Sequence, residues 1–141
     1  ITAGVGGLAY AGIPSTHRDT NHSVIFLTGH DATGKMPANV NWQAVATASP
    51  VIVMYMAVKN LGEIAHALLE GGRAPKDPVT IISNASLPHQ EIRSTTLGEA
   101  GAFVARDEEH ALDIAVALTA SGVCRTVRRA IGPVVGARVT G

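Results

Sequence analysis

Residues 51–56 read Val-Ile-Val-Met-Tyr-Met, an apolar run without a charged side chain. A strand with one face in water alternates apolar and polar residues, whereas a strand covered on both faces is apolar throughout. The uninterrupted run therefore predicts an internal strand of a layered α/β sheet. The longer apolar stretch, residues 51–58, is too short to span a bilayer, so we expect no association with a membrane.

Other strands and helices are indicated on both sides of this segment. Branched and aromatic residues predict a strand over residues 23–28, and apolar residues at helical spacing predict a helix over residues 60–71. A glycine-rich helix is expected to begin at a capping Thr2. The remaining expected elements are a helix over residues 41–48 capped by Asn41, strands over residues 79–83 and 92–96, a helix start at residues 95–99, a helix over residues 108–120 and a strand at residues 134–135. This alternation predicts one α/β domain over residues 1–141, with a mixed sheet flanked by helices.

The composition excludes several classes of protein. Hydrophobic residues make up 46% of the chain and charged residues 16%, which is typical of a folded domain and not of a disordered one. Eleven acidic residues balance eleven basic ones and aromatic residues amount to 4%, so we expect no nucleic-acid partner. The single cysteine rules out an internal disulfide and favours a reducing, cytoplasmic location.

Residues 29–36, Gly-His-Asp-Ala-Thr-Gly-Lys-Met, nearly match the phosphate-binding loop G-x-x-x-x-G-K-[ST]. Met36 occupies the position of the hydroxyl that would bind magnesium, and residues 38–41 continue a helix poorly. We therefore expect a polar loop and not a nucleotide site. The six histidines and Cys124 lack the spacing of a metal site, and the chain has no G-x-S-x-G nucleophile motif.

Two groups of residues could face a ligand. Arg18, in a loop between a helix and a strand, offers a guanidinium fork suited to carboxylates, although the spacing alone favours a solvated turn paired with Asp19. Met56 and Ala85 follow the ends of two strands, where α/β sheets bind their ligands. For Met56, core packing is the alternative, and the spacing alone leaves both interpretations open.

Taken in order, short segments across the first hundred residues resemble the uroporphyrinogen-III C-methyltransferases, which belong to the tetrapyrrole methylases. The matching segments are residues 1–3, 9–14, 16–18, 26–30, 55–56, 72–73, Pro78, 84–85 and 95–97. Each segment is short, but the ordered set is specific.

The resemblance implies a fold, a reaction and a set of contacts. Such enzymes are two-lobed homodimers that hold S-adenosylmethionine between two α/β lobes. They methylate two pyrrole carbons of uroporphyrinogen III to give precorrin-2, for sirohaem, cobalamin or haem d1. This chain is similar to the C-terminal lobe. By resemblance, the cofactor contacts are Thr2, Ala3, Met56 and Ala85, and the contacts to the tetrapyrrole substrate are Arg18 and His30. The substrate carries eight carboxylates, which suits Arg18, and His30 could donate a hydrogen bond or move a proton.

The resemblance also identifies what this stretch lacks. The glycine-rich cofactor loop and the residues usually assigned to catalysis belong to the N-terminal lobe, so we expect no catalytic residue in this half and no turnover by the isolated chain. Residues 106–130 depart from the family pattern, with three arginines between residues 125 and 129, and form an atypical tail region. Two alternatives stay open: a sister precorrin methyltransferase acting on a later intermediate, and a non-catalytic lobe that mediates dimerisation.

Overall fold

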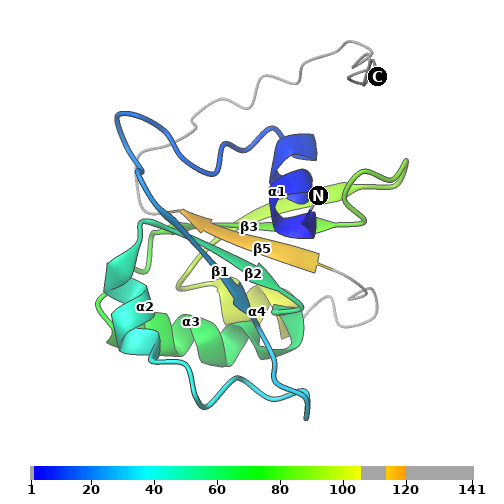
Figure 1. Ribbon diagram of the computed structural model, residues 1–141. Coiled ribbons are helices and arrows are strands. Elements are labelled where there is room, and N and C mark those ends of the chain that lie inside the picture. The colour runs from blue at the N-terminus through cyan, green and yellow to red at the C-terminus, as the bar shows by residue number, and fades with distance from the viewer. Residues whose placement is uncertain (1, 106–113, 120–141) are drawn as a thin grey trace, which may run out of the picture.

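The computed structural model describes residues 2–105 and 114–119. Its centre is a five-stranded sheet with the strand order β1-β2-β5-β3-β4 (Figure 1). Along the chain the elements are α1 (Ala3–Tyr10), β1 (Val24–Thr28), α2 (Trp42–Ala48), β2 (Val51–Tyr55), the short 3-10 helix η1 (Val58–Asn60), α3 (Leu61–Glu70), β3 (Pro78–Ser83), β4 (Glu91–Thr96), α4 (Ala100–Ala105) and β5 (Ile114–Thr119).

The sheet is mixed, as the sequence predicts. β1 runs parallel to β2, while β5 runs antiparallel to both of its neighbours, β2 and β3. β4 is antiparallel to β3 and forms one edge. The strands β1, β2 and β3 therefore all point in one direction, and their carboxyl ends lie along the same edge of the sheet.

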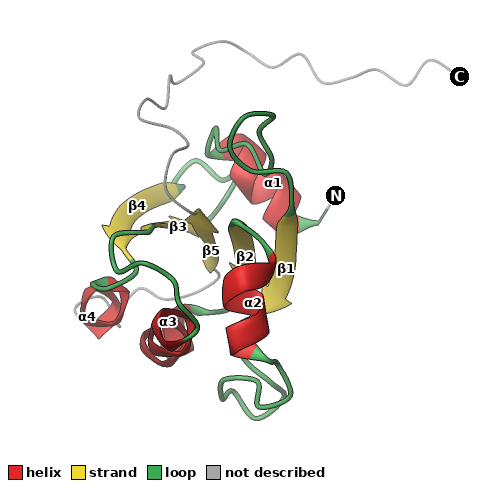
Figure 2. Cartoon of the chain, turned by 90° about the vertical axis from the view of Figure 1, so that its left-hand side faces the viewer, coloured by secondary structure: helices red, strands yellow, loops and turns green. Residues whose placement is uncertain are grey.

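Helices cover both faces of the sheet, but unequally. α2, α3 and α4 lie on one face, and α1 lies on the other (Figure 2). β2 supplies both cores: Ile52 and Met54 pack with the three-helix layer, and Val51 and Val53 pack with Leu8 of α1. The prediction that this apolar strand is covered on both faces is confirmed.

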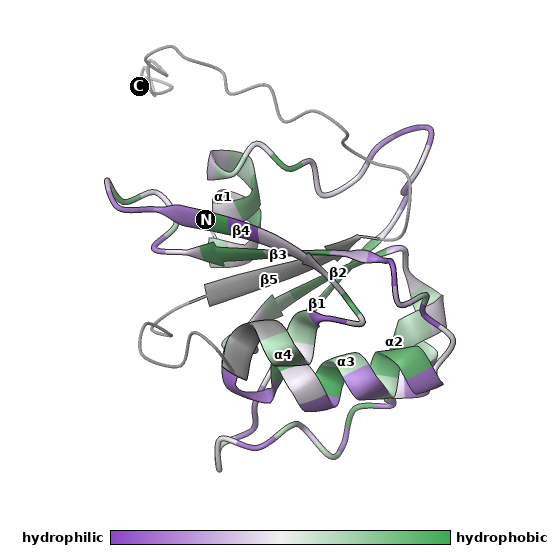
Figure 3. Ribbon diagram, turned by 180° about the vertical axis from the view of Figure 1, so that it is seen from behind, coloured by the Kyte–Doolittle hydropathy of each residue, from purple (hydrophilic) through white to green (hydrophobic). Residues whose placement is uncertain are grey.

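Hydrophobic residues concentrate on β2 and β3, and hydrophilic residues on the loops and part of β4 (Figure 3). α3 carries the clearest helical pattern: Leu61, Ile64 and Leu68 are fully buried against the sheet, and Glu63 and His66 on the other side are exposed. Among the described residues, no helix is both long enough and apolar enough to cross a membrane.

One predicted element is wrong. A helix was expected over residues 108–120, but residues 114–119 form β5 in the middle of the sheet. Val116 lies opposite Met54 on one side and Ile81 on the other, so the backbone is hydrogen-bonded along both edges of the strand. This pairing on both sides outweighs the helical preference of the alanines. Residues 106–113, like the strand expected at residues 134–135, lie outside the described residues.

The remaining predicted elements are confirmed with small shifts in their ends. Asn41 caps α2, because its side-chain Oδ1 accepts a hydrogen bond from the Ala44 amide at 3.0 Å. The helix predicted to start at residues 95–99 begins later, at Ala100, because β4 continues to Thr96.

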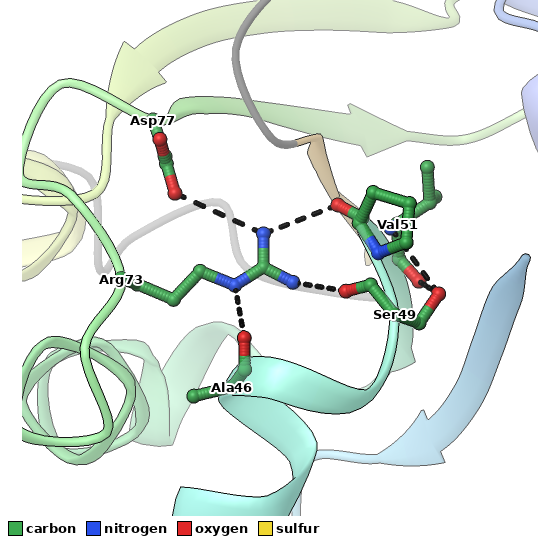
Figure 4. A network of polar contacts seen from close by, with 6 residues as sticks. Ala46, Ser49, Val51, Arg73 and Asp77 are labelled. Carbon is green, nitrogen blue, oxygen red and sulfur yellow. Dashed lines mark hydrogen bonds and ion pairs between the residues drawn. The ribbon is translucent and has the colours of Figure 1, made fainter. Parts of the chain in front are cut away.

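A buried arginine joins the end of α2 to the start of β2 (Figure 4). Arg73 Nε donates to the Ala46 carbonyl at 2.9 Å, Nη1 donates to the Pro50 carbonyl at 3.1 Å, and Nη2 donates to the Ser49 carbonyl. Nη1 also lies 3.8 Å from Asp77 Oδ2. Burial lowers the pKa of Arg73, and the Asp77 carboxylate opposes that shift. The guanidinium therefore satisfies the Ala46 and Ser49 carbonyls at the carboxyl end of α2 and the Pro50 carbonyl that precedes β2.

Candidate functional site

The residues that follow β1, β2 and β3 border one edge of the sheet. Gly29 and His30 follow β1, Met56 follows β2, and Ala85 comes two residues after β3 ends. Because these strands are parallel, the three segments emerge on the same side, which is where open α/β sheets bind ligands. β5 separates β2 from β3, so Met56 and the turn after β3 are about 10 Å apart at the usual strand spacing.

The turns after β2 and β3 are strained. Met56 has φ 53°, Asn84 has φ 51° and Ser86 has φ 70°, all in the left-handed region. Non-glycine residues adopt this conformation at a cost of about 1 kcal/mol or more, and such residues cluster at binding sites. Met56 is 49% exposed, so its thioether is not part of the core. This exposure argues against core packing, and the interpretation of Met56 as a wall for a ligand stays a prediction.

The amino end of α1 is attached to the same edge through a tyrosine. The Tyr55 hydroxyl lies 2.5 Å from Thr2 Oγ1 and accepts a hydrogen bond from the Gly4 amide at 3.1 Å. The Tyr55 ring stacks on Phe26 of β1, with 6.4 Å between ring centroids. The expectation that the Thr2 side chain caps α1 is wrong: Thr2 occupies the N-cap position but makes no capping hydrogen bond to the helix, because its hydroxyl pairs with Tyr55.

α1 also lies close to Ala85. A Cβ placed on Gly7 would sit 3.4 Å from the Ala85 Cβ, which is ordinary van der Waals contact. Gln90 strengthens this approach, because its side chain accepts a hydrogen bond from the Ser86 amide at 2.8 Å and donates to the Tyr10 carbonyl at 3.3 Å. The turn after β3 and the far end of α1 are thus held together by one amide side chain.

The loop that carries His30 is fixed by a buried asparagine. Asn60 Nδ2 donates to the Gly29 carbonyl at 2.9 Å and to the Gly34 carbonyl at 3.3 Å. The Gly29 amide donates to the Tyr55 carbonyl at 2.7 Å, which continues the pairing of β1 with β2. A Cβ at Gly29 would lie only 2.2 Å from the Ala57 Cα, so this close approach requires glycine.

The phosphate-loop motif folds differently from a nucleotide site. Asp31 Oδ1 accepts three hydrogen bonds, from the amide and hydroxyl of Thr33 and from the Lys35 amide. These bonds, led by the Thr33 hydroxyl, hold the pKa of Asp31 below its usual value. In a phosphate loop such amides face the phosphates and a helix follows the lysine, whereas here α2 begins only at Trp42. The prediction of a polar loop is confirmed.

His30 has a defined tautomer when neutral. Its Nδ1 lies 2.8 Å from the Asp31 carbonyl oxygen. A carbonyl can only accept, so Nδ1 carries the proton and Nε2 is the ring's acceptor. The side chain is half-buried. His30 can therefore accept a hydrogen bond or a proton through Nε2, and it can donate through that atom once it is protonated.

Arg18 is not brought to this edge. It is exposed and lies in the connection between α1 and β1, before the amino end of β1. Its carbonyl contacts His22 Nε2, and His17 pairs with Asn21, so the connection has its own local structure. The whole of β1, about 16 Å long at the usual rise per residue, lies between this connection and His30 along the chain. The other five predicted residues, Thr2, Ala3, His30, Met56 and Ala85, border the carboxyl edge.

Three residues with a clear part in this geometry were missed from the sequence: Tyr55, Asn60 and Gln90. Tyr55 lies within an apolar strand, and the other two resemble ordinary polar positions, so their hydrogen bonds across 51, 31 and 80 residues gave no local signal. Within residues 2–105 and 114–119, no three His, Cys, Asp or Glu side chains are grouped in a way that could hold a metal ion.

A mixed sheet with helices on both faces, strained turns at one edge and the amino end of a glycine-rich helix beside that edge places the chain in the layered α/β class, in which ligands bind beyond the carboxyl ends of the strands. Residues 1–101 match the family of tetrapyrrole (corrin/porphyrin) methylases. The chain belongs to this family.

Named relatives support the same assignment. The chain is 58% identical over 105 residues to a uroporphyrinogen-III C-methyltransferase of Sinorhizobium sp., an alignment that covers 74% of this chain and 38% of that protein. It is 41% identical over 115 residues to a siroheme synthase of Zymomonas mobilis, which covers 79% of this chain and 23% of that protein. The chain thus spans well under half of the length of these relatives.

A solved structure shares the fold. The uroporphyrin-III C-methyl transferase of Thermus thermophilus, complexed with S-adenyl homocysteine, superposes with a TM-score of 0.65 at 28% identity. The match covers 79% of this chain and 48% of that one.

Proposed function

We propose that this chain is the C-terminal lobe of a two-lobed, S-adenosylmethionine-dependent C-methyltransferase that converts uroporphyrinogen III to precorrin-2. The family membership and the 58% identity to a uroporphyrinogen-III C-methyltransferase support this function. The chain's share of such relatives, 38% of one and 23% of another, supports the view that the N-terminal lobe and the residues that perform the chemistry belong to a longer parent.

The observation that carries the proposal is the pair of left-handed turns at Met56 and Asn84 on one edge of the sheet, the first beside the start of α1 and the second beside its later residues. Left-handed residues turn the chain sharply, and here they leave the Met56 thioether exposed and place Ala85, half-buried, against α1. A separation of about 10 Å between the two turns suits the length of a nucleoside. Thr2 and Ala3 supply the third side. This set fits an adenosyl sulfonium compound, which binds through backbone polar atoms and apolar contacts and needs no metal.

When bound, S-adenosylmethionine supplies an electrophilic methyl group. The part of this lobe is to hold that group in line with a nucleophilic pyrrole carbon, and such positioning can lower a barrier by several kcal/mol. After the new carbon–carbon bond forms, the methylated ring must lose a proton. His30 Nε2, an acceptor in the neutral ring, is suited to accept a pyrrole N–H or to help to move that proton.

We propose Arg18 as a second substrate contact, toward a carboxylate at the rim of the macrocycle. Its exposed position at the other end of β1 requires that the substrate, or another part of the parent protein, reaches around the strand. We further propose that the parent works in the cytoplasm as a homodimer. One of the two relatives named above is a siroheme synthase, which supports the sirohaem pathway as one destination of the product.

The test is an assay of the full-length parent with uroporphyrinogen III and S-adenosylmethionine, followed by mass spectrometry of the tetrapyrroles. Two added methyl groups are expected. If the parent left uroporphyrinogen III unmodified but methylated a later corrin intermediate, the specific assignment would fail and the sister methyltransferase would replace it. If it neither methylated any tetrapyrrole nor bound S-adenosylhomocysteine, the dimerisation lobe would be favoured.

A second measurement concerns the 141-residue chain alone. We expect no turnover and only weak binding of S-adenosylhomocysteine by calorimetry, because one wall of the cleft is missing. Met56→Ala in the full-length parent should weaken that binding, while Ile92→Ala, at a similarly exposed position on β4, should not. Full activity of the isolated chain would contradict the two-lobe proposal.

A further inference from the structure

One phenol hydroxyl joins two elements of the proposed cofactor site. The Tyr55 oxygen lies 2.5 Å from Thr2 Oγ1 and 3.1 Å from the Gly4 amide nitrogen. Tyr55 immediately precedes Met56, and Thr2 and Gly4 flank Ala3. The contact therefore fixes the distance between the start of α1 and the strained turn after β2.

The hydroxyl also takes over the role of a helix cap. The first amides of a helix need an acceptor, which a threonine at the N-cap position normally supplies. Here the Thr2 side chain makes no capping bond, and the Gly4 amide is satisfied from a strand 51 residues away. The start of α1 is thus fixed by a contact to the sheet and not by a capping side chain of its own.

The packing around the hydroxyl leaves little freedom. A Cβ at Gly4 would lie 2.4 Å from the Tyr55 oxygen and 2.8 Å from the Phe26 ring, so only glycine lets the helix approach this closely. The Phe26 ring stacks on the Tyr55 ring at an interplanar angle of 24° and limits its rotation. A rigid aromatic pair therefore holds the phenol oxygen at the start of the helix.

We propose that Tyr55 is a positioning residue for the cofactor: its hydroxyl, held by Phe26, fixes the start of α1 so that Thr2 and Ala3 form one rigid wall with Met56. This inference rests on the proposed function, because it assumes that these residues contact the methyl donor. Under this proposal Tyr55 acts through its neighbours and does not contact the cofactor itself. Its hydroxyl affects the affinity for the cofactor more than the affinity for the tetrapyrrole.

The experiment uses Tyr55→Phe in the full-length parent, with S-adenosylhomocysteine as the calorimetric probe. Phenylalanine keeps the stack and removes only the hydroxyl. We expect the Kd for S-adenosylhomocysteine to rise roughly three- to tenfold, in line with the loss of one or two hydrogen bonds. The KM for uroporphyrinogen III should change less than twofold, a separation that general destabilisation would not produce.

The matched control is Ser23→Ala. Ser23 Oγ donates to Ser49 Oγ at 2.9 Å, so this change also removes a hydroxyl–hydroxyl bond, but at the opposite end of the parallel strand pair. The Kd of the Ser23→Ala protein for S-adenosylhomocysteine should equal that of the wild type. Thr2→Val removes the same contact from the helix side, and Thr2→Ser should restore it. In the double variant, Thr2→Val should add little to Tyr55→Phe, because the Thr2–Tyr55 hydrogen bond is already lost in Tyr55→Phe.

The outcomes separate the two proposals. Wild-type Kd in a folded Tyr55→Phe protein, or equal effects of Tyr55→Phe and Ser23→Ala, would overturn the positioning role and leave the proposed function intact. If Tyr55→Phe did not fold, an unchanged Kd in Thr2→Val would overturn the role instead. A wild-type parent that bound no S-adenosylhomocysteine would overturn the proposed function, and the cofactor role of Tyr55 with it.

Discussion

Removal of the Arg73 guanidinium is expected to cost a large part of the stability of the domain. In Arg73→Ala, the carbonyls of Ala46, Ser49 and Pro50 lose charged donors, and the buried Asp77 carboxylate loses its cation. A hydrogen bond to a charged group contributes about 1.5–3 kcal/mol, so three of them give at least about 4.5 kcal/mol before the desolvation of the cation is subtracted. We expect the free energy of unfolding to fall by about 4 kcal/mol.

Two further variants separate the contribution of the carbonyl hydrogen bonds from that of the ion pair. Arg73→Lys keeps the charge but offers a point donor instead of a planar fork, so it should recover about one carbonyl bond and lose about 2–3 kcal/mol. Asp77→Asn removes the ion pair alone. At 3.8 Å that pair is longer than a good hydrogen bond, and the guanidinium keeps its three carbonyl acceptors, so the loss of the pair should cost about 1 kcal/mol. The expected order of destabilisation is therefore Arg73→Ala, then Arg73→Lys, then Asp77→Asn.

The assay is urea unfolding followed by circular dichroism, with the free energy obtained by linear extrapolation. Domains of this size have about 5–15 kcal/mol of stability, so a loss of about 4 kcal/mol moves the midpoint clearly. An Asp77→Asn protein as destabilised as Arg73→Ala would refute the reasoning, because the ion pair would then outweigh the carbonyl bonds. So would an Arg73→Ala protein within about 1 kcal/mol of the wild type.

Three further predictions concern the loop that carries His30. Asn60→Asp should cost about 2–4 kcal/mol in urea unfolding and weaken tetrapyrrole binding, since a buried carboxylate would face the Gly29 and Gly34 carbonyls in place of an amide donor. Gly29→Ala should cost about 3 kcal/mol, because its methyl group would meet the Ala57 backbone. The pKa of Asp31 is lowered in the folded protein, so its contribution to loop stability is complete above the usual aspartate pKa and is lost as the pH falls through the lowered value, as an NMR titration of the loop amides would show.

Matched changes elsewhere serve as controls for these predictions. Gly62→Ala, in α3, places its methyl group 3.5 Å from the Gly101 Cα, an ordinary contact, and should stabilise the helix by about 0.5–1 kcal/mol. If it destabilised the protein as much as Gly29→Ala, the close approach would not be the cause. Asp31→Asn should abolish the acid transition of the loop, and a transition that persisted in this variant would assign it to another group.

Local patterns in the sequence predict most of the fold. The apolar run of β2, the helical spacing in α3 and the Asn41 cap each depend on residues near in sequence, and all three are confirmed. β5 could not be predicted in this way. Its six residues, Ile-Ala-Val-Ala-Leu-Thr, suit a helix or a strand, and only the position between β2 and β3 decides between them.

The site residues show the same difference between local patterns, which the sequence reveals, and long-range contacts, which it does not. The resemblance named short segments at the ends of three strands, and the structure places five of the six predicted residues along one edge. The positions of Tyr55, Asn60 and Gln90 could not be predicted, because their hydrogen bonds reach across 31 to 80 residues. Arg18 shows the converse: a local motif identified the residue, but only the path of the chain shows that β1 separates it from His30.

The position of β5 affects how the polypeptide folds while it is being synthesised. Four strands precede it in the sequence, yet it lies between β2 and β3, so a growing chain displays two open two-stranded ribbons until residues 114–119 emerge. Unpaired inner edges attract other chains, and pairings between distant segments form slowly. We therefore expect the nascent domain to depend on chaperones, and a synthetic Ile-Ala-Val-Ala-Leu-Thr peptide supplied in trans should rescue a polypeptide truncated before Ile114 by strand addition.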